Sequence, residues 1–129
     1  MNEQKTPAPA HPAPPGAVAV ASEQAQSVVE GFNEALALYR QGQWGEALGA
    51  LEPALQAAPA LVPGWLLKAR CHVQLGQTAA ALQAFADCLA RDEGNYSAWL
   101  ESGHLHRLNG SLDVAREAYA RAIALAPQR

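Results

Sequence analysis

Cysteine is scarce in this chain of 129 residues, which holds only two. Small oxidised scaffolds use several closely spaced cysteines, so this count argues against a disulfide framework and favours a reduced intracellular compartment. Lysine and arginine form no cluster and the formal net charge is −3, which argues against a basic nucleic-acid or membrane-surface footprint. No apolar run approaches the roughly 18 residues of a membrane span, and the start lacks the leucine-rich stretch of a signal peptide. We therefore expect a cytoplasmic protein with neither nucleic acid nor membrane as a partner.

Motifs of catalysis are also missing. The chain has no Gly-x-x-x-x-Gly-Lys phosphate loop, no Gly-x-Gly-x-x-Gly after a strand and no Gly-x-Ser-x-Gly nucleophile turn. His104 and His106 would point about 200° apart on a helix, so they cannot share a metal. Cys71 and Cys88 lack the close cysteine or histidine spacing of a zinc site. We predict no enzyme activity, no catalytic residue, no cofactor and no metal.

Proline is concentrated at the start, where the first 16 residues hold five of the nine, interleaved with alanine. Such a segment forms no regular hydrogen-bond ladder and buries no apolar stripe. We predict a disordered tail over residues 1–21 and a helix beginning at Ser22, which can act as N-cap ahead of the acidic Glu23. The alternative, a proline-rich ligand, is disfavoured because Pro9 and Pro12 have no adjacent arginine or lysine.

Beyond residue 22, apolar residues recur at intervals of three and four, which predicts helices and no sheet. Gly42, Gly76 and Gly110 punctuate this pattern 34 residues apart. Frames at residues 28–61, 62–95 and 96–129 align without insertion. A period of this length predicts a stack of helical hairpins within one domain, residues 22–129.

Recurring columns fit such hairpins. Small residues let the two helices of a hairpin approach closely, and they are Ala35, Ala69 and Gly103 on the first helices and Ala47, Ala81 and Ala115 on the second. Bulky residues fill the remaining space, and they are Leu51, Phe85 and Tyr119. The three glycines are predicted to end the first helices in a left-handed conformation.

Other positions carry local predictions. Ser111 and Thr78 are expected to cap second helices. Pro53 lies inside the second helix of the first frame and predicts a kink or a break between Gly49 and Pro53. His72 and His106 occupy one column, as do Trp65 and Trp99, so we interpret the histidines as packing residues with one hydrogen-bonded nitrogen and the tryptophans as core plugs.

The chain resembles three tandem tetratricopeptide repeats (TPRs), whose pattern is tryptophan, leucine, glycine, tyrosine, alanine, a phenylalanine-type residue and proline. The matching residues are Trp65, Ala69, Gly76, Ala81 and Phe85 in the second frame and Trp99, Gly103, Gly110, Ala115, Tyr119 and Pro127 in the third. The first frame departs from it, with Gly31 in place of the tryptophan. The resemblance implies an all-α right-handed superhelix of three helix-turn-helix hairpins, whose first helices line a concave groove for a protein or peptide.

Eleven residues on the first helices are the predicted lining of that groove. They are Phe32, Asn33, Leu36, Tyr39, Leu66, Arg70, Val73, Leu100, Glu101, His104 and Arg107. Their chemistry predicts a peptide ligand with an apolar anchor and an acidic group. The carboxylate clamp that members of the family use for chaperone tails is not expected, because the corresponding face carries Phe32, Leu36, Leu67, Ser97 and Glu101.

Three other interpretations stay open. The array can be the substrate-recruiting or oligomerising N-terminal part of a larger bacterial enzyme, such as a glycosyltransferase or sulfotransferase. It can form a homodimer through the apolar flank of its last hairpin, which no further helix covers. It can also be a small secretion-type chaperone that sequesters an apolar segment of another protein.

Overall fold

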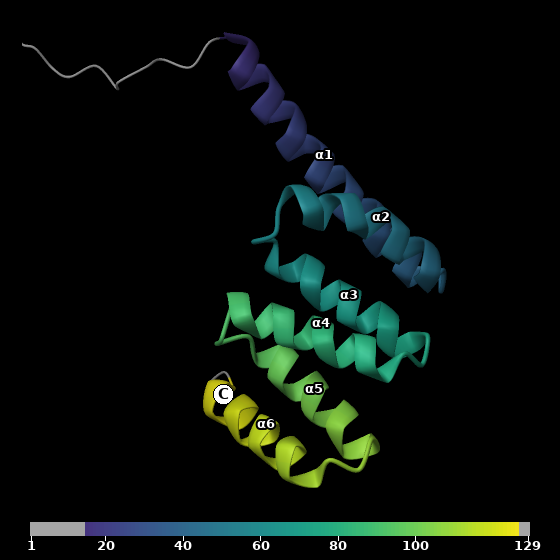
Figure 1. Ribbon diagram of the computed structural model, residues 1–129, viewed down its shortest axis with the longest axis vertical. Coiled ribbons are helices and arrows are strands. Elements are labelled where there is room, and N and C mark those ends of the chain that lie inside the picture. Colours follow the sequence, from purple (N-terminus) through teal and green to yellow (C-terminus); the bar gives the residue numbers. More distant parts are fainter. Residues whose placement is uncertain (1–14, 127–129) are drawn as a thin grey trace, which may run out of the picture.

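The structure, a computed structural model, describes residues 15–126 and side chains from residue 22 onward. Over that range the chain forms six helices and no strand (Figure 1). They are α1 (Pro15–Arg40), α2 (Trp44–Ala57), α3 (Val62–Gln74), α4 (Thr78–Arg91), α5 (Tyr96–Leu108) and α6 (Leu112–Leu125). The all-α prediction is confirmed, and none of these helices is both long and apolar enough to span a membrane.

The six helices pack as three hairpins that follow one another along a superhelix (Figure 1). Consecutive helices pair as α1 with α2, α3 with α4 and α5 with α6, and each hairpin stacks on the next through α2 with α3 and α4 with α5. First helices therefore lie along one side of the stack, where α1 also contacts α3. This is the architecture that the 34-residue period predicts.

Helix α1 begins earlier than expected. It starts at Pro15 and not at Ser22, so the helix start predicted from the N-cap pattern is wrong. Proline is well tolerated in the first turn of a helix, which needs no N–H donor, and alanine favours helix thereafter. The remainder of the predicted tail, residues 1–14, lies outside the described residues, as do residues 127–129 with Pro127.

The glycine column ends the first helices as predicted. Gly42, Gly76 and Gly110 have φ of 81°, 74° and 86°, the left-handed region that suits glycine. In each turn the residue after the glycine donates its N–H to a carbonyl five residues earlier, as Gln77 does to His72 at 2.9 Å. The three hairpins thus share one turn geometry.

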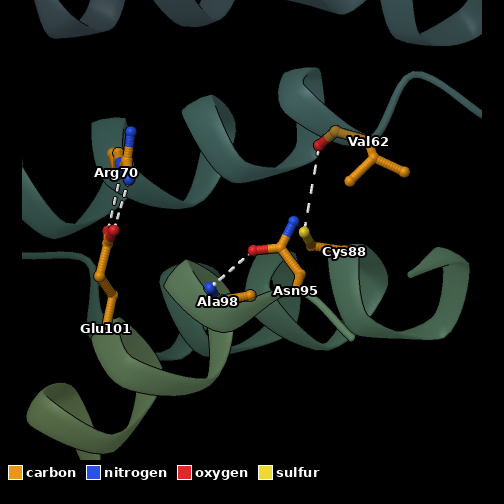
Figure 2. Close-up of polar contacts among 6 residues, drawn as sticks. All are labelled: Val62, Arg70, Cys88, Asn95, Ala98 and Glu101. Atoms are coloured by element: carbon orange, nitrogen blue, oxygen red, sulfur yellow. Dashed lines mark hydrogen bonds and ion pairs between the residues drawn. The ribbon is translucent and has the colours of Figure 1, made fainter. Parts of the chain in front are cut away.

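The capping predictions are not met. Ser111 stands at the N-cap of α6 but its hydroxyl makes no cap hydrogen bond, and Thr78 is already the first residue of α4. The side-chain cap occurs instead at α5, where Asn95 Oδ1 accepts from Ala98 N at 2.9 Å (Figure 2). Thr78 lies one residue beyond the N-cap Gln77, whereas Asn95 stands at the N-cap with an extended backbone, the conformation typical of a capping residue.

Small and bulky columns fill the core as predicted. Ala35, Ala47, Ala69 and Ala81 are completely buried between the helices of their hairpins. Leu51 and Phe85, each 1% exposed, are the largest of the fully buried side chains among the described residues. In the third hairpin a Cβ on Gly103 would lie 3.1 Å from the ring of Tyr119, so glycine is what lets that ring approach α5.

No break occurs at Pro53. Helix α2 runs without interruption from Trp44 to Ala57, so the break is ruled out, while the kink stays a prediction. Pro53 and Gly49 both lie on the exposed side of α2, where water can satisfy the carbonyl that loses its partner. The opposite side is held by the buried residues Leu51, Ala54 and Leu55.

Trp65 and Trp99 are half-buried, and each ties a helix to the turn before it. Trp65 packs against both apolar clusters of the core and donates its indole N–H to Pro59 O at 2.8 Å. Trp99 donates in the same way to Glu93 O at 2.7 Å. Cations cover the rings, with Arg91 Cζ 4.3 Å from the centre of Trp65 and Arg121 Cζ 5.0 Å from Trp99. Trp65 thus packs against the core as interpreted, whereas Trp99 belongs to neither apolar cluster of the described residues and is held at its turn.

Candidate functional site

A cleft of about 220 Å³ opens on the side of the stack formed by the first helices. Its walls come from all three hairpins, and the lining residues are Tyr39, Arg70, Val73, Gln74, Phe85, Glu101, His104, Leu105 and Leu108. Phe85 from α4 is fully buried and forms part of the floor. Val73 and Leu108 are exposed at 37% and 74%, which leaves apolar surface at the mouth for a ligand to cover.

An ion pair crosses the cleft between α3 and α5. Arg70 Nε donates to Glu101 Oε1 at 2.8 Å, and a second guanidinium nitrogen contacts Glu101 Oε2, so the contact is bidentate (Figure 2). This hydrogen bonding raises the pKa of Arg70 above its ordinary value, against a smaller opposing effect of burial. Both side chains remain partly exposed, at 38% and 30%. Glu101 therefore balances the charge of Arg70 within the protein. The main role of this ion pair is to hold α3 and α5 together, and binding of a ligand by Arg70 comes second.

The α5 end of the cleft is polar. Tyr119 Oη lies 2.9 Å from His104 Nδ1 and accepts a hydrogen bond from Arg107 Nε at 3.1 Å. The rings of His104 and Tyr119 meet edge to face with centroids 5.3 Å apart. His104 and Arg107 are exposed and have no described carboxylate as a partner. This end can accept an anionic or hydrogen-bonding group.

Five of the eleven predicted groove residues line the cleft. They are Tyr39, Arg70, Val73, Glu101 and His104. Phe32, Leu36 and Leu66 pack instead against the apolar clusters between the helices. Asn33 is exposed and Leu100 is half-buried, and neither lines the cleft. Arg107, also on α5, lines the neighbouring cavity together with residues of α6.

Sequence reasoning missed four lining residues. They are Gln74, Phe85, Leu105 and Leu108. Gln74 and Leu108 share one column, 34 residues apart and one turn beyond Arg70 and His104, so extending the predicted face by one turn would have found both. Phe85 was assigned to the core, and it serves both core and cleft.

Histidines and cysteines have different surroundings. His72 Nδ1 lies 2.6 Å from Gln77 Oε1, as the packing interpretation predicts, whereas the buried His106 Nδ1 has no hydrogen-bond partner among the described residues. Cys71 and Cys88 are free and fully buried, and burial raises the pKa of each thiol to about 11. Across the part of the chain that the structure describes, histidine, cysteine and carboxylate side chains form no group of three.

Two family models, each described as tetratricopeptide repeat, match the sequence over residues 38–84 and 66–129. The chain belongs to the tetratricopeptide repeat family. Six helices in three hairpins agree with three TPRs. A search of curated proteins found no match.

Solved structures of TPR domains share this fold at low sequence identity. The first TPR domain of Spaghetti (RPAP3), bound to the HSP90 peptide SRMEEVD, is 19% identical with a TM-score of 0.76 over 81% of this chain and 82% of that one. The Yersinia enterocolitica secretion chaperone SycD, in complex with a peptide of the translocator YopD, is 14% identical with a TM-score of 0.77 over 81% and 79%. The Arabidopsis OM64 TPR domain is 20% identical with a TM-score of 0.77 over 82% and 88%. Similarity at this level concerns the fold.

Proposed function

We propose that this protein is a binding module without catalysis of its own, which holds a peptide segment of a partner protein in the cleft between the first helices. The observation that carries the proposal is the open cleft with apolar walls and one polar end. The RPAP3 and SycD structures, each with a peptide bound, support it by showing that the fold carries such ligands.

The lining suggests the chemistry of the ligand. Val73, Leu105 and Leu108 offer apolar surface for an anchoring side chain. Arg70 is already paired with Glu101, so an acidic group of the ligand belongs at the exposed cation Arg107, with the ring of His104 beside it as a hydrogen-bonding group. The ligand is therefore a segment with an apolar anchor followed by a carboxylate, extended or helical.

Peptide-array screening followed by calorimetric titration tests this function. Val73→Asp with Leu108→Asp should remove binding of the selected peptides, because both place a charge on the apolar walls. Arg70→Glu with Arg107→Glu should also abolish capture. Arg121→Glu reverses an exposed charge on α6 that lines neither the cleft nor the cavity beside it, and it is the matched control. Selected peptides that bind all these variants equally would contradict the groove assignment.

The HSP90 peptide SRMEEVD serves as a specific negative probe. We expect no binding, because Glu101 stands on the face where a carboxylate clamp needs cations, and it neutralises Arg70. Tight binding of SRMEEVD would show that the acidic group is recognised without such a clamp, and would shift the ligand class to chaperone tails.

A secretion-type chaperone is the second candidate function. The fold shared with SycD, which binds a translocator peptide, favours it. Co-expression with an aggregation-prone secreted partner would test it, since a chaperone of this kind keeps its client soluble. A role as the recruiting part of a larger enzyme stays a prediction, as does a cytoplasmic location.

A further inference from the structure

The flank of the last hairpin carries apolar side chains that no described residue covers. A cavity of about 360 Å³ opens there between α5 and α6, lined chiefly by Arg107, Leu112, Arg116, Tyr119 and Ile123. Leu112 is 61% exposed and Ile123 is 74% exposed. We call these five residues the C-terminal face.

The column of Ile123 is covered elsewhere in the chain. Ile123 corresponds by the 34-residue period to Leu55 and Leu89. Leu55 is only 5% exposed, because α3 packs over it and brings Gly64 against its Cδ2. Leu89 packs into the cluster that α5 completes. A helix laid across the hairpin is thus the shape that covers this column.

The opposite end of the array has a hollow with an acidic rim, which is opposite in charge to the C-terminal face. Between α1 and α2 lies another cavity of about 360 Å³, with small or apolar walls and an acidic rim, and the residues that define it are Glu30, Gly31, Glu34, Pro53, Ala54 and Ala57. It is open because Gly31 occupies the column that Trp65 and Trp99 fill in the later repeats. We call these six residues the N-terminal face.

Charge decides which faces can meet. Two C-terminal faces in contact would bring the cations of Arg107 and Arg116 together, and two N-terminal faces would bring the carboxylates of Glu30 and Glu34 together. A C-terminal face against an N-terminal face pairs cations with carboxylates and sets Leu112 and Ile123 over an apolar hollow. We infer that the protein associates head to tail with a second copy of itself, its C-terminal face seated on the partner's α1 and α2.

Such a contact is heterologous, because it joins two different faces, so the association extends as chains or closes as a ring and does not stop at a symmetric dimer. The junction cannot reproduce the internal stacking closely. Glu30 occupies the column of Gly64, where even a Cβ would lie 2.8 Å from Leu55 Cδ2. The helix α1 of the second copy must therefore lie further out, which makes the association weaker than the internal junctions and sensitive to salt.

Sedimentation velocity of the full chain, without peptide, over a wide range of concentration and at low and high salt tests the inference. The average mass should rise with concentration and fall with salt. The variant Glu30→Arg/Glu34→Arg and the variant Arg107→Glu/Arg116→Glu should each associate about tenfold more weakly or not at all. Circular dichroism establishes that both are folded, and Glu93→Arg, in the turn away from both faces, should associate like the wild type.

Mixing the two reversed variants distinguishes the geometry. Each has two faces of like charge, yet the mixture again offers opposite faces and should recover association. A symmetric dimer through the C-terminal face would instead survive Glu30→Arg/Glu34→Arg unchanged, and that result overturns the inference. A wild type that stays monomeric throughout, or a mixture that fails to recover, overturns it equally. None of these outcomes depends on whether the cleft binds a peptide.

Discussion

The first repeat and the two later ones differ at the position of the tryptophan, and the difference explains what that residue does. Trp65 and Trp99 each donate the indole N–H to a carbonyl six residues earlier, in the turn that precedes the helix. Gly31 has no such turn before it, because Ala25 lies inside the continuous helix α1, where its carbonyl belongs to the helical ladder. The tryptophan therefore belongs to the junction between hairpins, and glycine takes its place in α1, where the helix continues in place of a turn.

The two junctions also differ from each other at equivalent positions. Arg70 and Glu101 form the ion pair between α3 and α5, whereas the same columns between α1 and α3 carry Leu36 and Leu67. Leu67 is 3% exposed and packs in the first apolar cluster together with Leu36. The same stacking geometry thus accepts either an apolar pair or an ion pair. The ion pair between α3 and α5 makes the centre of the cleft polar.

Removing the junction tryptophan should have the largest effect. Trp65→Ala is expected to lower the free energy of unfolding by about 3 kcal/mol, because it empties a site shared by both clusters. Trp65→Phe keeps most of the apolar area and loses the bond to Pro59 O, so it should cost about 1 kcal/mol. Urea denaturation measures both. A fully neutral Trp65→Phe would contradict the turn-anchoring role.

Adding a methyl group should act in opposite directions at two helical glycines. Gly64→Ala places a Cβ 2.8 Å from Leu55 Cδ2 and is expected to destabilise the protein by about 1 kcal/mol. Gly31→Ala finds its closest contact at 3.4 Å, on Ala50 O, and should stabilise by about 0.5 kcal/mol through helix propensity. Thermal denaturation of the two variants side by side decides the matter. If both variants lower the melting temperature equally, α1 is packed as tightly around Gly31 as α3 is around Gly64.

Converting the ion pair to the apolar pair of the first junction should change stability little. Arg70→Leu/Glu101→Leu is expected to unfold within about 0.5 kcal/mol of the wild type, since a partly exposed ion pair contributes about that much. Arg70→Leu alone should be less stable than the double variant, because it leaves Glu101 without its partner. A double-mutant cycle in chemical denaturation gives the coupling. If the double variant is the least stable of the set, the two junctions are not interchangeable.

Alkaline pH should weaken the middle repeat in particular. The pKa values of Cys71 and Cys88 are raised to about 11 by burial, so the folded state favours the neutral thiols. Their contribution to stability is complete below the ordinary thiol pKa near 9.0 and is lost as pH rises through about 11. The repeats on either side carry Ala54 and Ala122 in the column of Cys88. Cys71→Ala/Cys88→Ala should therefore flatten the alkaline part of the stability profile, and an unchanged profile would assign that slope to other groups.

The 34-residue period of the sequence predicted most of the fold but few of the contacts that form the cleft. The glycine and alanine columns predicted the turns at Gly42, Gly76 and Gly110 and the helix contacts of Ala35 and Ala69, because backbone conformation and close approach restrict those positions to few residue types. Side-chain partners followed no such restriction. Nothing in the spacing of Arg70 and Glu101 showed that they bond to each other, and Leu108 became part of a cleft only because α5 stacks beside α3.

By itself, then, the sequence determined that this chain builds three helical hairpins, since a repeated pattern of small, bulky and left-handed positions has one compact solution. Only the tertiary structure decided which charges are balanced, which aromatic residues hold the turns and which apolar surface stays open. Those outcomes depend on distances between residues of different repeats. The amino-acid sequence fixes which side chains recur in each repeat, but the packing of one hairpin on the next fixes which of those side chains are in contact.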